Sequence, residues 1–265
     1  MHNNWKRFAV YWIPRFGTDL AAFGRGWTGW CAELGAPASD EAARALVAGH
    51  PGSLWSISRH GLHAPICEPF KLAKGRSLWR LEHHLRSVAE NAAAIPLPRF
   101  QVTVRTGRVV LALERTSERL EELQGRVKDA VHLVGRRKAA RPSRATACPT
   151  GGIALEPSEV HPGRLVCPFD MPLTDQIEAS AAYDLAADLY PQLSKILTLP
   201  QRVSDLALMG DPGGGRPWRL IQRYRLIGGD KVSVGKGPTG MYCPDERPMP
   251  PVTSLMGSDW DTVIP

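Results

Sequence analysis

The chain has 265 residues, which is enough for one large domain or two small lobes around a hydrophobic core. Its apolar and charged fractions, 43% and 22%, are typical of soluble proteins. No apolar run approaches the roughly 20 residues that cross a bilayer, and the polar start of the chain lacks the pattern of a secretory signal. We therefore expect a cytoplasmic protein without a membrane span.

The five cysteines are scattered and never spaced as C-x-x-C, which argues against both a disulfide framework and a zinc site. The glycine-rich segment 229–237 has Gly237 where a phosphate loop carries the Ser or Thr that binds magnesium. Pro238 follows it instead of a helix. The sequence therefore predicts neither a metal site nor a cofactor.

The spacing of apolar residues predicts the elements in the first half of the chain. Leu78, Leu81 and Leu85 recur at steps of three and four, which is typical of an amphipathic helix. Alternation at Phe8 and Val10 favours a strand. In chain order we expect a strand over residues 7–13, a helix that begins at Thr18 or Asp19, helices over 39–47 and 77–94, and a hairpin with strands over 100–104 and 108–113.

The second half of the chain is less regular, and its basic, proline-containing middle is typical of a loop or linker. In chain order we expect a helix over 117–134, this basic linker over 135–162, a helix over 174–189, a turn over 211–215, a strand over 218–227 and then an extended tail. The order of elements predicts an α+β fold of two pseudo-symmetric lobes, each a small antiparallel sheet backed by helices. The lobes would comprise residues 1–115 and 116–228, with the tail over 229–265.

Positive charge is concentrated in the middle of the chain. Between residues 101 and 150, eleven Lys or Arg residues stand against five Asp or Glu residues, a local balance of +6. Such a segment suits nucleic acid, a phosphorylated ligand or an acidic partner, and a solvated basic loop explains it equally well. The candidate partner-binding cations are Arg136, Arg137, Lys138, Arg141 and Arg144. Trp260, in the proline-rich tail, is a candidate contact for a protein partner.

The most specific segment is residues 59–77, RHGLHAPICEPFKLAKGRS. It resembles the first signature of the phosphonate-operon proteins of the two-histidine phosphoesterase superfamily, approximately Y-G-F-H-A-T-L-x-x-P-F-x-L-A-x-G-R-S. The opening RFAVYWIP at residues 7–14 resembles that family's first strand, and residues 20–30 resemble its following helix. The resemblance covers residues 7–115 well and the rest in outline, and it implies a link to phosphonate metabolism.

The resemblance implies two H-x-T/S motifs that face each other across a cleft between the lobes. One histidine would act as general base and the other as general acid on a phosphodiester, while the hydroxyls bind phosphate oxygens. His63 matches the first histidine, but Pro65 occupies the hydroxyl position and can donate no hydrogen bond. The expected second motif strand, residues 218–228, contains no histidine, and the last histidine of the chain is His161.

Three arginines occupy that late strand instead. Arg219, Arg223 and Arg225 are all odd-numbered, so alternation predicts one shared face. With His60 and His63 across the cleft, they would bind a phosphate or carboxylate, and their charge would keep His63 neutral. The alternative is that this face is the solvated side of an edge strand.

Three functions follow from these patterns. The first is a diverged, non-hydrolytic protein that binds a phosphorylated small molecule, a nucleotide end or a protein partner through a basic cleft. The second is a working phosphoesterase in which His63 acts with Arg223 as electrostatic stabiliser. The third is an assembly protein that binds other subunits through the basic linker and the tail.

Overall fold

The computed structural model describes residues 5–38, 57–135 and 168–228, which belong to one compact unit of the chain. Among these residues no helix is long and apolar enough to cross a membrane. The helix expected over 39–47, the basic linker beyond Gly135 and the tail over 229–265 lie outside the described residues.

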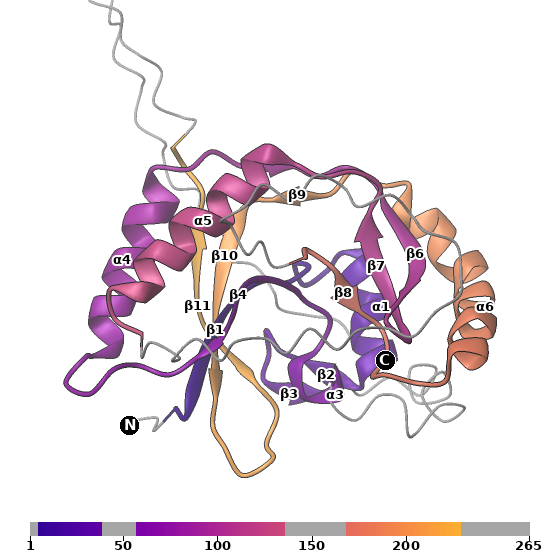
Figure 1. The fold of residues 1–265 in the computed structure, drawn as a ribbon, viewed down its shortest axis with the longest axis horizontal. Coiled ribbons are helices and arrows are strands. Elements are labelled where there is room, and N and C mark those ends of the chain that lie inside the picture. The colour runs from indigo at the N-terminus through magenta and orange to yellow at the C-terminus, as the bar shows by residue number, and fades with distance from the viewer. Residues whose placement is uncertain (1–4, 39–56, 136–167, 229–265) are drawn as a thin grey trace, which may run out of the picture. The chain divides into compact units, whose positions relative to one another are not determined.

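A four-stranded antiparallel sheet organises this unit, with the strand order β11-β10-β1-β4 (Figure 1). Its strands are β1 (Arg7–Trp12), β4 (Ala64–Phe70), β10 (Asp205–Asp211) and β11 (Arg219–Arg225). On β1, Tyr11 lies opposite Pro65 of β4 on one side and opposite Ala207 of β10 on the other. The strands predicted over residues 7–13 and 218–227 are confirmed.

The central strand β10 was not predicted from the sequence. All seven of its residues are buried, so its sequence DLALMGD lacks the alternation of apolar and polar residues that marks a half-buried strand. Asp205 and Asp211 at its two ends further give the segment the composition of a turn. This strand lies between β1 and β11, and it therefore fixes the place of β11 in the sheet.

The remaining strands form small antiparallel sheets, which confirms the α+β class. The predicted hairpin is present as β6 (Phe100–Arg105) and β7 (Arg108–Leu113), and β8 (Met171–Pro172) adds to its β7 edge. The hairpin turns at Thr106 and Gly107, whose φ angles of 50° and 71° are both in the left-handed region. Two further pairs join β2 (Trp30–Cys31) to β3 (Ala36–Pro37) and β5 (Ile95–Pro96) to β9 (Arg202–Val203).

Three of the predicted helices are present with small changes at their ends. They are α1 (Asp19–Thr28), α4 (Leu78–Glu90) and α5 (Glu118–His132), and a short helix α3 (Ile57–His60) was not predicted. The Thr18 hydroxyl starts α1 by accepting a hydrogen bond from the Ala21 amide, and Gly29 ends it with a φ of 67°. α4 packs against β10 and β11, and α5 packs against β4, so both cover one face of the sheet (Figure 1).

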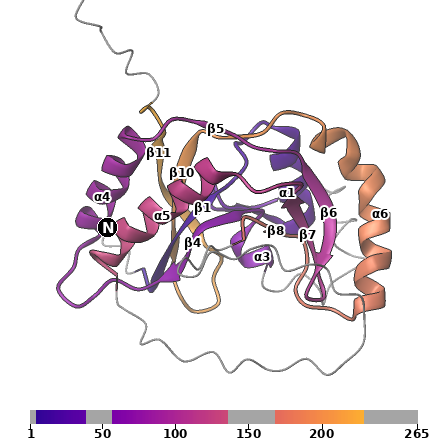
Figure 2. The same cartoon turned by 45° about the horizontal axis from the view of Figure 1, so that its top comes forward.

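The last helix, α6 (Ala179–Leu197), differs from the predicted 174–189 at both ends. It begins later because Glu178 caps it, accepting a hydrogen bond from the Ala181 amide at 3.1 Å. It ends later because Leu193 and Leu197 continue its buried stripe, and this burial outweighs the backbone hydrogen bond that Pro191 removes. Figure 2 shows α6 beside β6, and it packs on both strands of the hairpin.

The two faces of the four-stranded sheet carry separate apolar clusters. On one face Val10 and Leu208 pack with the buried leucines of α4 and α5. On the other face Ala9, Tyr11, Ile13, Ala207 and Met209 pack with Trp30, Ala32 and Trp218. The candidate histidines lie on this second, Tyr11-bearing face.

The sheet also changes the predicted division into lobes. It takes β1 and β4 from residues 1–115 and β10 and β11 from residues 116–228. A boundary at residue 115 therefore does not separate the sheets, because β10 brings the second half of the chain back onto β1.

Gly24 offers a test of the packing that holds the His63 segment. A Cβ atom at Gly24 of α1 would lie 2.6 Å from the Cβ of buried Leu62, which precedes His63. Gly24→Ala should therefore lower the free energy of unfolding by a net of about 1–2 kcal/mol, although alanine favours a helix by about 1 kcal/mol. Urea unfolding measures the change. Ala22→Ser, on the exposed side of α1, is the control, and an unchanged Gly24→Ala would contradict this packing.

Candidate functional site

His63 lies in the short connection between α3 and β4. Gly61 makes this connection with a φ of 70°, and its amide donates a hydrogen bond to the Ile57 carbonyl at 3.0 Å, which ends the helix. The chain then enters β4 directly after His63, with Ala64 paired to Trp12 of β1. The histidine is therefore held by the end of one element and the start of the next.

The imidazole of His63 is packed inside the protein. The side chain is only 8% exposed, and the centre of its ring lies 4.2 Å from the centre of the Tyr11 ring. Nδ1 lies 2.8 Å from the Gly61 carbonyl oxygen, which can only accept, so Nδ1 carries the proton and donates it there. The Nε2 atom is therefore the one with the lone pair.

Burial lowers the pKa of His63 to about 4, although the Gly61 carbonyl and the charge of Glu68 act in the opposite direction. The side chain is therefore neutral at pH 7, as expected from the sequence. The expected cause is wrong, because desolvation lowers this pKa and the three arginines of β11 are not among the charges that act on it.

His60 lies beside His63, with 5.2 Å between their ring centres, and stacks on Trp218 at 4.9 Å. Its Nδ1 shares a hydrogen bond of 3.2 Å with the Tyr11 hydroxyl. Burial lowers the pKa of His60 to about 3, and the nearby His63, Arg59 and Arg7 lower it further while Asp211 raises it. Both histidines are therefore neutral across the physiological pH range.

Pro65 offers no donor at the position where the H-x-T/S motif implied by the resemblance would carry a hydroxyl. It is the second residue of β4, and its carbonyl oxygen accepts a hydrogen bond from the Gln124 side chain at 3.1 Å. The backbone of the motif strand is therefore tied to α5 at this position.

The prediction that His63 and the arginine-bearing strand face each other across a cleft is wrong. β4 and β11 belong to the same sheet, at its opposite edges, with β1 and β10 between them. Three strand spacings of about 4.8 Å separate the two edges by about 14 Å. The error follows from missing β10, which takes the position next to β1.

The prediction that the three arginines share one face is also wrong. Leu208 pairs with Gln222 and Met209 pairs with Leu220, so β11 carries one extra residue at this point. Directly opposed residues share a face, and Arg219 lies opposite Gly210 whereas Arg223 lies opposite Ala207. Because positions 207 and 210 are an odd number of residues apart, Arg219 and Arg223 lie on opposite faces.

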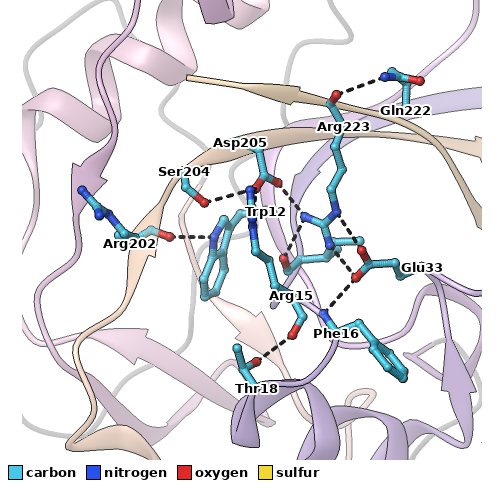
Figure 3. Close-up of polar contacts among 11 residues, drawn as sticks. Trp12, Arg15, Phe16, Thr18, Glu33, Arg202, Ser204, Asp205, Gln222 and Arg223 are labelled. Carbon is cyan, nitrogen blue, oxygen red and sulfur yellow. Dashed lines mark hydrogen bonds and ion pairs between the residues drawn. The ribbon is translucent and has the colours of Figure 1, made fainter. Parts of the chain in front are cut away.

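Arg223 is held in an internal ion-pair network (Figure 3). Its Nη1 donates to the Asp205 carboxylate at 2.5 Å, and its Nη2 donates to the Glu33 carboxylate at 2.9 Å. Asp205 is 2% exposed and also accepts two hydrogen bonds from Arg15, at 2.8 and 3.0 Å. Burial lowers the pKa of Arg223, but the two carboxylates raise it above its ordinary value.

This network joins the segment after β1, the β2–β3 turn, β10 and β11, as Figure 3 shows for the residues labelled there. Two guanidiniums and two carboxylates balance, so Arg223 serves the fold and its donors are already engaged by Asp205 and Glu33. Arg219 and Arg225 are exposed, and the aliphatic chain of Arg219 lies over Gly35. The solvated-edge alternative therefore describes these two residues.

The structure surrounds His60 with residues that the sequence analysis did not single out as a group. They are Tyr11 of β1, Trp218 at the start of β11, and the charged side chains of Arg7, Arg59 and Asp211. Their positions in the sequence range from 7 to 218, so no local motif could have predicted the cluster.

Among residues 5–38, 57–135 and 168–228, no group of three His, Cys, Asp or Glu side chains could hold a metal ion. The predicted partner-binding residues lie outside these ranges and stay predictions; they are Arg136, Arg137, Lys138, Arg141, Arg144 and Trp260.

Two solved structures are similar to this chain. The crystal structure of E. coli LigT complexed with NADP+ is 12% identical with a TM-score of 0.41, and the match covers 83% of this chain and 98% of that chain. A crystal structure of a phosphoesterase is 14% identical with a TM-score of 0.41, and the match covers 84% and 98%. No protein-family model and no curated protein matches the chain. Membership of the phosphonate-operon family therefore stays a prediction, and similarity this distant assigns no activity.

The ion-pair network predicts a large effect of removing one buried charge. Asp205→Asn should lower the free energy of unfolding by about 3–5 kcal/mol, because Arg15 then loses the carboxylate it pairs with and the half-buried Arg223 keeps Glu33 alone. Urea unfolding measures the loss, and Asp188→Asn on the exposed side of α6 should stay within about 0.5 kcal/mol of the wild type. Equal stability of the two variants would show that the network contributes little.

The two neutral histidines predict a pH dependence of stability. Because the pKa of His63 is about 4 in the folded chain and about 6.5 when exposed, the unfolded chain takes up a proton first as the pH falls. The stabilisation is complete above pH 6.5 and is lost toward pH 4. Between pH 7 and 5 each such histidine should lower the free energy of unfolding by about 2 kcal/mol.

Chemical unfolding at pH 5, 6 and 7 measures this slope. His63→Gln should make the slope shallower without abolishing it, since the pKa of His60 is lowered as well. A wild-type free energy of unfolding that does not change between pH 5 and 7 would contradict the buried, neutral state of both rings.

Proposed function

We propose that this protein is a diverged, non-hydrolytic relative of the two-histidine phosphoesterases that binds a phosphorylated ligand without turning it over. The observation that carries the proposal is the state of His63, which is buried, neutral, covered by Tyr11 and hydrogen-bonded to its own loop. Each of these features suits a side chain that supports the fold better than one that exchanges protons with a substrate.

A general acid or base works best when its pKa lies near the operating pH. With a pKa of about 4, His63 would be protonated in only about one molecule in a thousand at pH 7, so it could not serve as an acid. The sequence has no histidine after His161 to act as its partner, and Pro65 supplies no hydroxyl for a phosphate oxygen. Catalysis by a pair of histidines therefore lacks the second histidine, and His63 itself cannot act as the acid.

The alternative of an active phosphoesterase required Arg223 as an electrostatic stabiliser beside His63. Arg223 donates to Asp205 and Glu33, and β11 lies at the opposite edge of the sheet from β4. This alternative therefore loses the group that was to stabilise charge in its transition state.

A protein partner is the second candidate function. Tyr183 and Tyr190 of α6 are 65% and 61% exposed, and their spacing of seven residues places them on the same side of the helix. Large exposed aromatic side chains at helical spacing favour contact with another surface. The basic linker and Trp260 remain further predictions for such a partner.

The proposal predicts no turnover at this site. The purified protein should hydrolyse 2′,3′-cyclic nucleotides and a generic phosphodiester no faster than His63→Ala, because one positioned acid or base contributes about 10²–10⁴-fold and this site supplies no such pair. Initial rates from pH 5 to 9 measure this.

Thermal unfolding of both proteins must first show that His63→Ala is folded at the assay temperature. His63→Gln serves as a second variant, because its amide can still donate to the Gly61 carbonyl. Turnover by the wild type that disappears in both folded variants would overturn the proposal.

A further inference from the structure

Cationic side chains gather around the turn that joins β10 to β11, the loop that extends beyond the two strands in Figure 1. Arg216 lies within the turn, and a terminal nitrogen of Arg59 approaches its carbonyl oxygen at 3.5 Å. Lys6 also borders the turn, since a Cβ at Gly213 would lie 2.7 Å from its Cγ. Arg7 lies over the ring of Trp218, with its guanidinium carbon 5.5 Å from the ring centre. We call Lys6, Arg7, Arg59 and Arg216 the turn cations.

One carboxylate, Asp211, is paired with this group among the described residues. It accepts hydrogen bonds from Arg7 at 2.8 Å and from the Gly213 amide at 2.8 Å, and these bonds hold its pKa below the ordinary value against the effect of burial. Four cations against one carboxylate leave an excess of three positive charges. Arg59 and Arg7 also disfavour the charged form of His60, which is the expected effect of a positive potential at this place.

Some hydrogen-bond donors near the β10–β11 turn have no acceptor. Arg59 Nε and Trp218 Nε1 are buried and have no acceptor among the described residues. Arg216 donates to the carbonyls of Gly213 and Pro212, so part of its guanidinium points back into the turn. A polyatomic anion would accept hydrogen bonds from the guanidiniums of Arg59 and Arg216, whereas the indole nitrogen of Trp218, which is 0% exposed, is out of its reach.

The backbone of the turn is open to such an anion. Gly213, Gly214 and Gly215 have φ angles of 78°, 65° and 77°, a conformation that side chains disfavour. A Cβ at Gly214 or at Gly215 would meet no atom within 4 Å, so nothing in the described residues covers this stretch. Gly214 and Gly215 are exposed, whereas the Gly213 amide is already bonded to Asp211, so a ligand can approach the turn from the side of Gly214 and Gly215.

From these observations we propose that the β10–β11 turn, with Lys6, Arg59 and Arg216, binds the phosphate group of a small phosphorylated ligand. The inference rests on the proposed binding function and gives it a location. This location differs from the predicted basic cleft, because Arg223 is engaged by carboxylates and Arg219 and Arg225 are exposed on β11.

Isothermal titration of the full-length chain with inorganic pyrophosphate at low salt tests this site. We expect saturable binding with one site per chain. Arg59→Gln and Arg216→Gln should each weaken it about ten-fold or more, because each removes a charge-assisted hydrogen bond to the anion. Arg80→Gln, an exposed arginine of α4, is the matched control and should bind as the wild type does. Added salt should weaken binding, since Lys6 and Arg216 are exposed.

The possible results distinguish a wrong location of the phosphate site from a wrong function of the protein. Pyrophosphate binding that survives both Arg59→Gln and Arg216→Gln would overturn the location and leave a phosphate-binding protein. No saturable binding by the wild type would overturn the site itself. An equal loss of pyrophosphate affinity in Arg80→Gln would show that the anion is attracted by the overall charge of the protein and not by a specific site. Turnover of a phosphodiester that depends on His63 would overturn the non-hydrolytic function. It would leave the proposed phosphate site at the β10–β11 turn intact. Because Arg216 is exposed, its variant should fold even if Arg59→Gln does not.

Discussion

β10 lies between β1 and β11 and is hydrogen-bonded to both, and this pairing fixes where the candidate arginines of β11 lie relative to His63. β10 pairs the second half of the chain with β1, and β11 therefore lies at the edge of the sheet opposite β4. Asp205 at one end of β10 anchors the Arg15 and Arg223 network, whereas Asp211 at the other end pairs with Arg7 beside the glycine-rich turn. Among the described residues, each end of this buried strand thus carries a group of charged side chains; the group at Asp205 is balanced and the group at Asp211 has an excess of positive charge.

The same arrangement explains the state of the histidines. Tyr11 of β1 packs against His63 and bonds to His60, and Trp218 stacks on His60 from the start of β11. Aromatic rings therefore replace water around both imidazoles, which lowers their pKa values and keeps them neutral. Acid–base catalysis by a pair of histidines would require the opposite environment, because a catalytic pKa lies near the operating pH.

Much of the fold was predictable because its helices and outer strands are half-buried and therefore periodic in sequence. α4, α5 and the β6–β7 hairpin agree with the expected elements for this reason. β10 was not predictable from periodicity, because burial on both faces removes alternation. The bulge that places Arg219 opposite Gly210 has no sequence signal of its own, yet it changes the face of a residue assigned to the site. The cluster around His60 depends on that topology, so it could be recognised only in three dimensions.

A non-hydrolytic function requires that His63 is a packed, neutral side chain, and the pKa of this histidine can be measured directly. A proton NMR titration of the imidazole C–H resonances, assigned with His63→Gln, should show that His63 titrates with a pKa near 4. A value at or above the ordinary 6.5 would mean that the ring is solvated or faces a negative charge. It would then be able to exchange protons near neutral pH, and the non-hydrolytic account would be wrong.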